Sequence, residues 1–296
     1  MQPPSLARQS VMTRVSPRLM GIVIVLISAV MWSLAGPFVR MANLDIWSIV
    51  GWRSVFTALT LFVWIALRPP SEVPMQFGRG GMLVTLISTC ASIAYVVALS
   101  WTTVANVMTI YATLPFIAGL MAFLWYRERV SGRFILAGMI ALAGICTMVG
   151  GAAFTTRDLL GILIALVMTS AFALQLVVAR RYPRLDSARM VAYAALLCIP
   201  LALPFMPLAL PSGRALLACA LYGAITTGLG YILVLIGGRL IGAGEAGFLS
   251  LIDVVLGPAW VWVFFGERMS ALSILSAMTV LGAVVWYLGS GGLARR

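Results

Sequence analysis

A short stretch of sequence occurs twice in the chain. Residues 128–142 read ERVSGRFILAGMIAL, and residues 267–281 read ERMSALSILSAMTVL. At this offset of 139 residues, seven of the 15 positions are identical, and they include the charged Glu-Arg pair. At an offset of 140, Arg40 falls on Arg180. Chance similarity between apolar helices is the alternative, but it does not explain the shared charged residues, so the sequence predicts two related halves.

The composition of the 296 residues is that of a membrane protein. Hydrophobic residues make up 62% of the chain and charged residues 9%, and the mean hydropathy is +1.07. Many uncharged runs reach the roughly 20 residues that a helix needs to cross a bilayer. These runs are continuously apolar, whereas the strands of a membrane β-barrel alternate between apolar and polar residues. The sequence therefore predicts an all-α membrane protein with many spans.

The gaps between charged residues predict ten transmembrane helices. They cover residues 19–39, 46–67, 80–126 (two helices), 134–156, 159–179, 190–213, 215–238, 246–266 and 269–294. The run 80–126 is too long for one crossing, and its polar break at residues 100–103 is the expected turn. Pro200, Pro204 and Pro207 predict a kink in the seventh helix, because proline removes a backbone hydrogen bond.

The distribution of arginine predicts the orientation of these helices. All 20 basic residues are Arg, against 8 acidic residues, and the net charge is +12. In a soluble protein this balance would suggest nucleic acid, a partner we do not expect here because the arginines lie in short loops. The ten-helix scheme puts 15 Arg on one side and only Arg40, Arg157, Arg214 and Arg268 on the other. The positive-inside rule then predicts a protein of the inner (plasma) membrane with both termini in the cytoplasm.

The repeat and the helix count together predict two inverted halves. We expect a cytoplasmic tail at residues 1–18, a first five-helix repeat at 19–156, a second at 157–292 and a cytoplasmic C-terminus at 293–296. Because five is odd, the second copy crosses the membrane in the opposite sense. Inverted repeats of this kind occur in secondary transporters, whose substrate sites lie near the bilayer midplane where the halves meet.

Several motifs are shared with a known family. They are short groups of residues near helix ends, in both copies: Trp32, Arg40, Trp52-Arg53-Ser54, Pro115, Glu128-Arg129, Leu256-Gly257-Pro258 and Phe265-Gly266-Glu267-Arg268. In this arrangement the chain resembles the drug/metabolite transporter superfamily, specifically its ten-helix EamA-type branch, over about residues 19–290. The resemblance implies that helices one to four and six to nine surround the transport pathway, and that the fifth and tenth helices are peripheral.

Within that branch, the chain most resembles the exporters of aromatic and neutral amino acids. The resemblance lies in residues 252–260, which read IDVVLGPAW. They depart from the commoner pattern of the branch, which has Glu-Pro where this chain has Asp253-Val254. The resemblance implies amino acids as the substrate class.

Two charged residues, Asp253 and Arg53, lie inside predicted helices. An ionisable group in hydrocarbon costs at least ~2.5 kcal/mol, so Asp253 should face a cavity or a partner. It serves either as a site for a substrate ammonium group or a proton, or in a structural role, as part of an ion pair or as the cap of a helix break next to Pro258. For Arg53 we favour a structural, orienting role over transport. For Glu128 and Glu267, which lie at helix-joining turns, we expect helix capping.

The candidate substrate-binding residues are polar or aromatic side chains within predicted helices. Asn106, Thr109 and Thr113 are spaced to share one helix face. The complete set is Trp32, Tyr95, Trp101, Asn106, Thr109, Thr113, Phe172, Gln175, Tyr231, Asp253 and Trp260. The alternative for the polar members is hydrogen bonding between helices, and for the aromatic members it is anchoring at the membrane interface.

The sequence predicts a secondary transporter that exports small amphipathic metabolites. Aromatic and neutral amino acids come first among them on the family resemblance. We expect alternating access driven by the substrate gradient, because the chain has no His and no ATP-binding motif. A proton-coupled antiporter of cationic drugs is one alternative, against which stands the absence of an acid in residues 19–39. An intramembrane enzyme is another, but the sequence lacks the clustered His, Asp or Cys that such catalysts need.

The same residues predict few partners. We expect no catalytic residue, metal or cofactor, and a monomer that contacts lipids and a small-molecule substrate. The four cysteines occur singly in apolar runs, at positions 90, 146, 198 and 219. We expect them to be small buried residues rather than disulfides or metal ligands.

Overall fold

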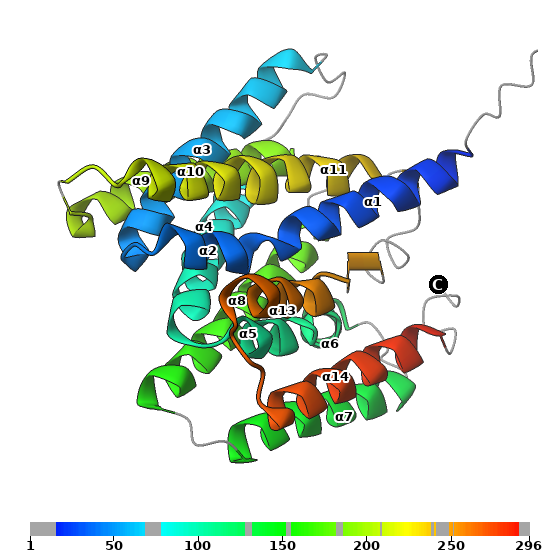
Figure 1. Cartoon of the computed structure of the whole chain (residues 1–296). Coiled ribbons are helices and arrows are strands. Elements are labelled where there is room, and N and C mark those ends of the chain that lie inside the picture. Colours follow the sequence, from blue (N-terminus) through cyan, green and yellow to red (C-terminus); the bar gives the residue numbers. More distant parts are fainter. Residues whose placement is uncertain are drawn as a thin grey trace, which may run out of the picture.

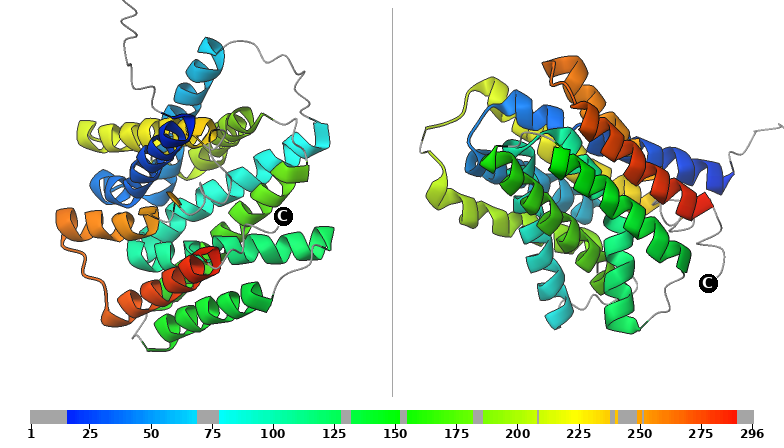
Figure 2. Two further views of the ribbon diagram at one scale, coloured as in Figure 1. Left: turned by 90° about the vertical axis from the view of Figure 1, so that its right-hand side faces the viewer. Right: turned by 90° about the horizontal axis from the view of Figure 1, so that it is seen from below.

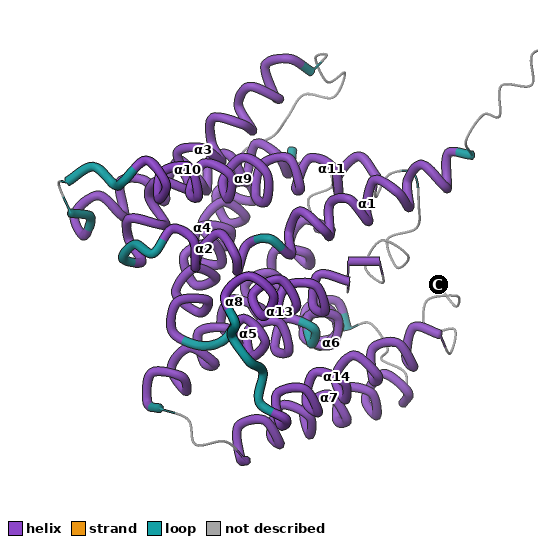
Figure 3. Tube along the Cα trace, viewed as in Figure 1, coloured by secondary structure: helices purple, strands orange, loops and turns teal. Residues whose placement is uncertain are grey.

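The structure is a computed structural model, and its described part is entirely helical (Figures 1 and 3). It describes residues 16–68, 78–127, 132–151, 155–181, 186–207, 209–237, 240, 249–250 and 252–289. No strand occurs within these ranges. The predicted all-α class is therefore confirmed.

The helices fall into an earlier and a later group along the chain. The earlier ones are α1 (Pro17–Ser33), α2 (Ala35–Ala42), α3 (Ile46–Leu67), α4 (Gly78–Trp101), α5 (Val104–Tyr111), α6 (Leu114–Tyr126) and α7 (Gly132–Gly151). The later ones are α8 (Thr156–Arg181), α9 (Ser187–Ala202), η1 (Leu203–Phe205), α10 (Gly213–Leu221), η2 (Tyr222–Leu229), α11 (Gly230–Gly237), α13 (Ile252–Phe265) and α14 (Ala271–Gly289).

Several of these helices are long and apolar enough to cross a membrane. In the described residues seven qualify, counting α1–α2, α5–α6, α9–η1 and α10–η2–α11 as one span each. Three shorter apolar helices lie at Gly132–Gly144, Ile252–Phe265 and Ala271–Tyr287. The predicted turn at residues 100–103 is confirmed, because α4 ends at Trp101 and α5 begins at Val104. A total of ten spans stays a prediction.

Polar residues mark where helices begin. Ser16, Asp45, Thr103, Asp186 and Ser212 each accept a hydrogen bond from a backbone N–H group in the first turn of the helix that follows. Such caps satisfy donors that have no partner inside the helix. The helices α1, α3, α5, α9 and α10 therefore each begin at a capping side chain.

The helices of the two halves pack in matching pairs. α1 packs on α11 as α8 packs on α4, and α1 packs on α13 as α8 packs on α6. Three further contacts join equivalent helices, namely α3 with α9, α5 with α13 and α7 with α14. Exchanging the halves maps each of these contacts onto another or onto itself. The packing therefore repeats the internal symmetry of the sequence, as two units related by a twofold axis would.

α7 and α14 form a pair at the edge of the bundle (Figures 1 and 2). Identical residues of the two copies face outward on both helices. Ile135 and Ile274 are 51% and 45% exposed, and Met139 and Met278 are 63% and 66% exposed. Exposed apolar side chains of this kind are compatible with contact to the lipid tails of a membrane. The peripheral position expected for the fifth and tenth spans is thus found for α7 and α14.

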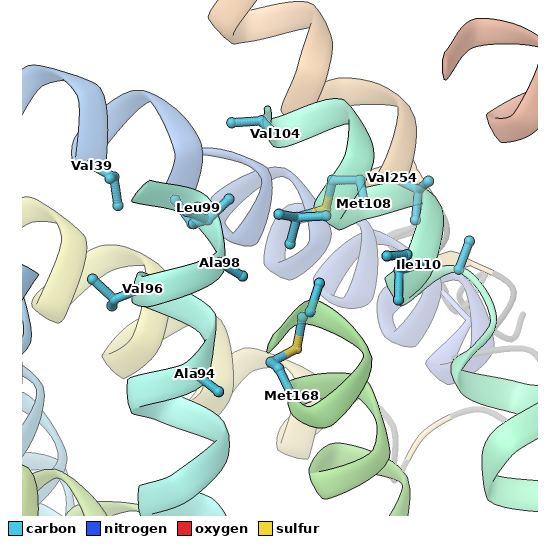
Figure 4. Close-up of a cluster of buried hydrophobic side chains, with 14 of the residues drawn as sticks. Val39, Ala94, Val96, Ala98, Leu99, Val104, Met108, Ile110, Met168 and Val254 are labelled. Atoms are coloured by element: carbon cyan, nitrogen blue, oxygen red, sulfur yellow. The ribbon is translucent and has the colours of Figure 1, made fainter. Parts of the chain in front are cut away.

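A large apolar core joins helices from both halves (Figure 4). Val39 of α2, Leu99 of α4, Met108 of α5, Met168 of α8 and Val254 of α13 all belong to it. All five residues are at most 5% exposed. The core lies between the halves, so each half buries apolar surface against the other.

The kink predicted for the seventh span appears where α9, which contains Pro200, gives way to the 3-10 turn η1.

The expectation that the cysteines are buried is right for Cys198 and Cys219 and wrong for Cys90 and Cys146, which are exposed. An apolar residue in a membrane helix can face lipid as well as the core, and hydropathy does not distinguish the two.

Candidate functional site

Besides the span in which α9 gives way to η1, three spans depart from regular α-helix along their length. α1 gives way to α2 at Leu34, α5 to α6 at Ala112 and Thr113, and α10 to α11 through the π-helical segment η2. At the second break, Pro115 has no N–H to donate, and the Thr113 hydroxyl donates to the carbonyl oxygen of Ile110 (2.6 Å). Interrupted helices are typical of midplane binding sites in transporters.

A cavity of about 220 Å³ lies where these interrupted spans meet. Its lining comes from α1, α3, α4, α5, α6, α8, α9, η2, α11 and α13, and so from both halves. The lining residues are Trp32, Arg53, Ser54, Thr57, Ser88, Ser92, Tyr95, Tyr111, Leu114, Phe172, Gln175, Val191, Ala194, Ala195, Tyr222, Thr226, Thr227, Tyr231 and Asp253. Arg53 and Asp253 are the charged residues of this lining.

Arg53 projects from α3 and is 3% exposed. Its guanidinium donates hydrogen bonds to the Ser92 hydroxyl of α4 and to Thr227 Oγ1 of η2 (3.4 Å). Its Cζ lies 5.1 Å from the centre of the Tyr222 ring, in cation–π distance. No carboxylate of the described residues forms an ion pair with it. Within the described part of the chain, the positive charge is therefore held by hydroxyls and a ring, without a counter-ion.

The π-helical segment η2 brings hydroxyl groups to this arginine. Gly223 lets η2 approach α3 closely, because a Cβ atom there would lie 2.3 Å from the carbonyl oxygen of Arg53. The Thr57 hydroxyl bonds this oxygen (3.0 Å) and the Gly223 carbonyl (3.2 Å). π-helical turns are rare and frequently occur at functional sites. Here the turn places Tyr222, Thr226 and Thr227 on the cavity wall.

Asp253 lies in the first turn of α13 and is 3% exposed. Its Oδ1 atom has no hydrogen-bond partner, and no arginine of the described residues pairs with it. The positive end of a helix dipole favours a carboxylate at this place. Of the two structural alternatives for Asp253, the ion pair is not seen in the described part of the chain, and the capped helix break stays open, because Asp253 lies in the first turn of α13.

Aromatic side chains form much of the remaining wall. The Trp32 ring fits against Gly230, where a Cβ atom would lie 2.8 Å from Trp32 Cδ1. The same glycine's carbonyl accepts a hydrogen bond from Ser28 Oγ (2.7 Å). Tyr111 of α5 and Phe172 of α8 meet edge to face, with ring centres 6.0 Å apart. The cavity thus combines two separate charges with flat apolar surfaces.

Six of the eleven candidate residues lie on the cavity: Trp32, Tyr95, Phe172, Gln175, Tyr231 and Asp253. They come from α1, α4, α8, α11 and α13, and the fold brings them together. Whether they bind substrate stays a prediction.

The other five candidates lie outside the described lining of this cavity: Trp101, Asn106, Thr109, Thr113 and Trp260. Trp101 ends α4. Thr109 and Thr113 bond carbonyl oxygens of their own helix, at Ala105 and Ile110. The indole N–H of Trp260 donates to Ser33 Oγ (3.0 Å).

Asn106 is a connector between α5 and α14. Its Nδ2 donates to Thr102 Oγ1 (3.0 Å), and its Oδ1 accepts a hydrogen bond from Ser273 Oγ (2.9 Å). The residue is 2% exposed. These contacts correspond to the alternative of interhelical hydrogen bonding.

Sequence reasoning missed several lining residues, above all Arg53. A lone arginine within a span was interpreted as structural, although the high cost of burying it is also an indication of function. Tyr222, Thr226 and Thr227 lie in the segment Tyr222–Leu229, whose π-helical geometry the sequence does not reveal. Ser88 and Ser92 are four residues apart on α4 and therefore share a face, a spacing that could have been noticed.

Comparison with known proteins agrees with this architecture. A solved crystal structure of another protein matches with a TM-score of 0.65 at 17% sequence identity, over 90% of this chain and 96% of that one, which shows a shared fold. No curated protein matches the sequence. The model of the EamA-like transporter family matches the chain twice, at residues 19–150 and 159–289. The chain therefore belongs to the EamA-like transporter family, and it is a multi-pass membrane transporter of small solutes.

Proposed function

We propose that this transporter exports small amphipathic metabolites, and aromatic and neutral amino acids first among them. The observation that carries the proposal is a pair of buried opposite charges in the cavity lining, Arg53 and Asp253, which form no ion pair with any described residue. An amino acid has a carboxylate, an ammonium group and a side chain that suits an apolar or aromatic wall. Buried charges are costly unless paired, so a ligand that supplies both counter-charges is favoured.

The size of the cavity supports a small solute. Pockets that bury drug-sized ligands measure roughly 300–1,000 Å³. The cavity here measures about 220 Å³, below that range. This difference favours a single metabolite over a bulky cationic drug.

The mechanism we propose is alternating access. Arg53 belongs to α3 of the first half, and Asp253 to α13 of the second. A rocking motion of one half against the other would expose the cavity to each side of the membrane in turn. The motion requires no ATP, and the substrate gradient drives it.

We further propose a monomer in the inner membrane, with both termini in the cytoplasm. The start of α1 and the end of α14 lie on the same side of the bundle (Figure 1), in agreement with an even number of crossings. Reporter fusions that are active only in the cytoplasm should be active at both ends of the chain. Activity at one end alone would contradict the arrangement.

Counterflow in proteoliposomes tests the function. Vesicles loaded with unlabelled phenylalanine or leucine should accumulate the labelled amino acid from a trace outside concentration, and protein-free vesicles should not. Absence of exchange for every amino acid tested would refute the proposed substrate class.

A second candidate is exchange of substrate for protons, with Asp253 as the carrier. Its burial and its free Oδ1 on the cavity wall favour this candidate. It differs from the first in one measurable respect. Substrate flux would respond to an imposed pH gradient, whereas flux in gradient-driven export would not.

A further inference from the structure

We propose that Arg53 and the hydroxyl groups around it form a subsite for the carboxylate of the substrate. The inference rests on the proposed function and makes it more specific. It assigns the anionic end of the ligand to α3, α4 and η2, and it gives Arg53 a role in specificity instead of the orienting role that the sequence suggested.

Five buried donors in the cavity lining have no hydrogen-bond partner. Two are the hydroxyls of Ser54 and Tyr222, and the other three are Arg53 Nε, Ser88 Oγ and Thr226 Oγ1. Their residues are 3%, 6% and 4% exposed, and all three line the cavity. A buried polar group without a hydrogen bond destabilises the folded protein. Three such groups on one cavity wall are therefore explained by a ligand that accepts their hydrogen bonds.

Hydrogen bonds of Arg53 join the three elements that carry these donors. Arg53 bonds Ser92, which lies one helical turn after Ser88 on α4, and Thr227, which follows Thr226 in η2. The guanidinium of Arg53 therefore lies between α4 and η2. Its Nη atoms donate to Ser92 and Thr227, and its Nε atom has no hydrogen-bond partner.

The chemistry of these donors, one guanidinium and two hydroxyl groups, favours a carboxylate as the ligand. An arginine side chain only donates hydrogen bonds, and its charge favours an anionic acceptor. Serine and threonine hydroxyls can donate to the same oxygen atoms. No acidic residue of the described lining pairs with this arginine, and Asp253 stands on α13, on the other half. A monocarboxylate would neutralise the charge and satisfy the hydroxyls together.

Three related compounds distinguish the contribution of the carboxylate from that of the ammonium group. Phenylalanine has both charged groups, 3-phenylpropionate lacks the ammonium group, and phenethylamine lacks the carboxylate. In competition with labelled phenylalanine in counterflow, we expect 3-phenylpropionate to compete and phenethylamine to compete at least about tenfold less well, a difference of about 1.4 kcal/mol. Equal competition by phenethylamine, while phenylalanine is exchanged, would overturn the subsite and leave the proposed function standing.

Variants assign the effect to the residues. Arg53→Gln should raise the half-saturation concentration for phenylalanine at least about tenfold and abolish competition by 3-phenylpropionate, and Arg53→Lys should be intermediate because it keeps the charge but loses the planar fork. Thr226→Val removes a hydroxyl that has no partner in the protein, so folding is preserved and the half-saturation concentration should rise about threefold. Thr169→Val is the matched control, because Thr169 is buried but bonds its own helix at the Ala165 carbonyl (2.8 Å).

A binding measurement covers the case in which a variant does not transport. The purified wild-type protein should be stabilised against heat by 3-phenylpropionate, and the Arg53→Gln variant should not. An unchanged half-saturation concentration in Arg53→Gln and Thr226→Val, or equal stabilisation of the wild type and Arg53→Gln by 3-phenylpropionate, would overturn the subsite. Stabilisation of the wild type without any amino-acid exchange would uphold the subsite and refute the proposed function.

Discussion

Arg40 and Glu267 form an ion pair that joins the two halves, with 3.0 Å between Nε and Oε2. The same guanidinium donates to the carbonyl oxygens of Leu99 (2.9 Å) and Thr102 (3.2 Å). The other carboxylate oxygen of Glu267 accepts a hydrogen bond from the N–H of Val104 (3.3 Å). These bonds hold α2, the turn between α4 and α5, and the segment after α13 together at one end of the bundle. Glu267 has the expected capping role, on a helix of the other half, whereas Glu128 lies outside the described residues.

Removing this ion pair should loosen one entrance to the cavity. The two side chains are 27% and 24% exposed, so the pair contributes no more than about 1 kcal/mol, which corresponds to a change of roughly fivefold in the population of the open state. In a cysteine-free background, Ala195→Cys places a thiol on the cavity wall. We expect Arg40→Gln to raise the rate of its modification by a membrane-impermeant reagent about fivefold.

Arg214→Gln is the control for that experiment. Arg214 is exposed and borders the same surface pocket as Arg40. The control should leave the modification rate unchanged. Equal rates in both variants would show that the Arg40–Glu267 pair does not restrict access to the cavity.

Replacing Asp253 by asparagine should weaken transport without making it depend on pH. The substitution keeps the shape of the side chain and removes the charge that we expect to bind the substrate ammonium group. The half-saturation concentration for phenylalanine should rise at least about tenfold, since a hydrogen bond to a charged group contributes about 1.5–3 kcal/mol. Wild-type counterflow should ignore an imposed pH gradient. A wild-type flux that follows the gradient, and a variant that has lost this response, would support the proton exchanger instead.

Gly223→Ala should destabilise the protein at the contact between α3 and η2. The added Cβ atom would lie 2.3 Å from the carbonyl oxygen of Arg53 and 2.9 Å from the backbone nitrogen of Thr57, so a backbone has to move. Overpacking of this kind costs roughly 1–3 kcal/mol. We expect a lower melting temperature in detergent and weaker phenylalanine counterflow, because Arg53 shifts with its helix.

The matched control is Gly282→Ala on α14. A Cβ atom there meets no other atom within 4 Å, and alanine is the better helix former by about 1 kcal/mol. Its melting temperature should stay the same or rise. A Gly223→Ala variant as stable as this control would show that the close approach of α3 and η2 is not needed.

Asn106→Ala should reduce stability and leave substrate recognition unchanged. The substitution removes the hydrogen bond to the Thr102 hydroxyl and one of the two bonds of the Ser273 hydroxyl, which keeps its bond to Ser270 (2.9 Å), at a cost of about 1–3 kcal/mol. The melting temperature should fall, and the half-saturation concentration for phenylalanine should stay within about twofold of wild type. An increase as large as that in Arg53→Gln would return Asn106 to the substrate site.

The class of fold was predictable because hydropathy and the repeated Glu-Arg motif report on properties spread over many residues. A helix of 20 apolar residues is recognised by its length alone. Residue exposure was less predictable, as Cys90 and Cys146 show, since lipid and the protein core attract the same side chains. In a membrane, apolarity does not indicate which face of a helix is inside.

The candidate site was predictable only where a residue is unusual for its place. Asp253 was identified because an acid is costly in hydrocarbon, and the same reasoning applied to Arg53 would have found it. Asn106, Thr109 and Thr113 were expected to bind substrate from one helix face, but the two threonine hydroxyls donate to backbone carbonyls a few residues earlier, at Ala105 and Ile110. Threonine commonly forms such local bonds in helices, and spacing alone does not show whether a hydroxyl is free.

The separation of Arg53 and Asp253 on the cavity wall has a consequence for the return step of the proposed cycle. A bound zwitterion masks both ions while the halves change position. After release, each ion has to stay solvated by water or protein dipoles through the reverse motion, which costs several kcal/mol when solvation is incomplete. We therefore expect the unloaded protein to reorient more slowly than the loaded one. Exchange of solute across the bilayer should then be faster than net export.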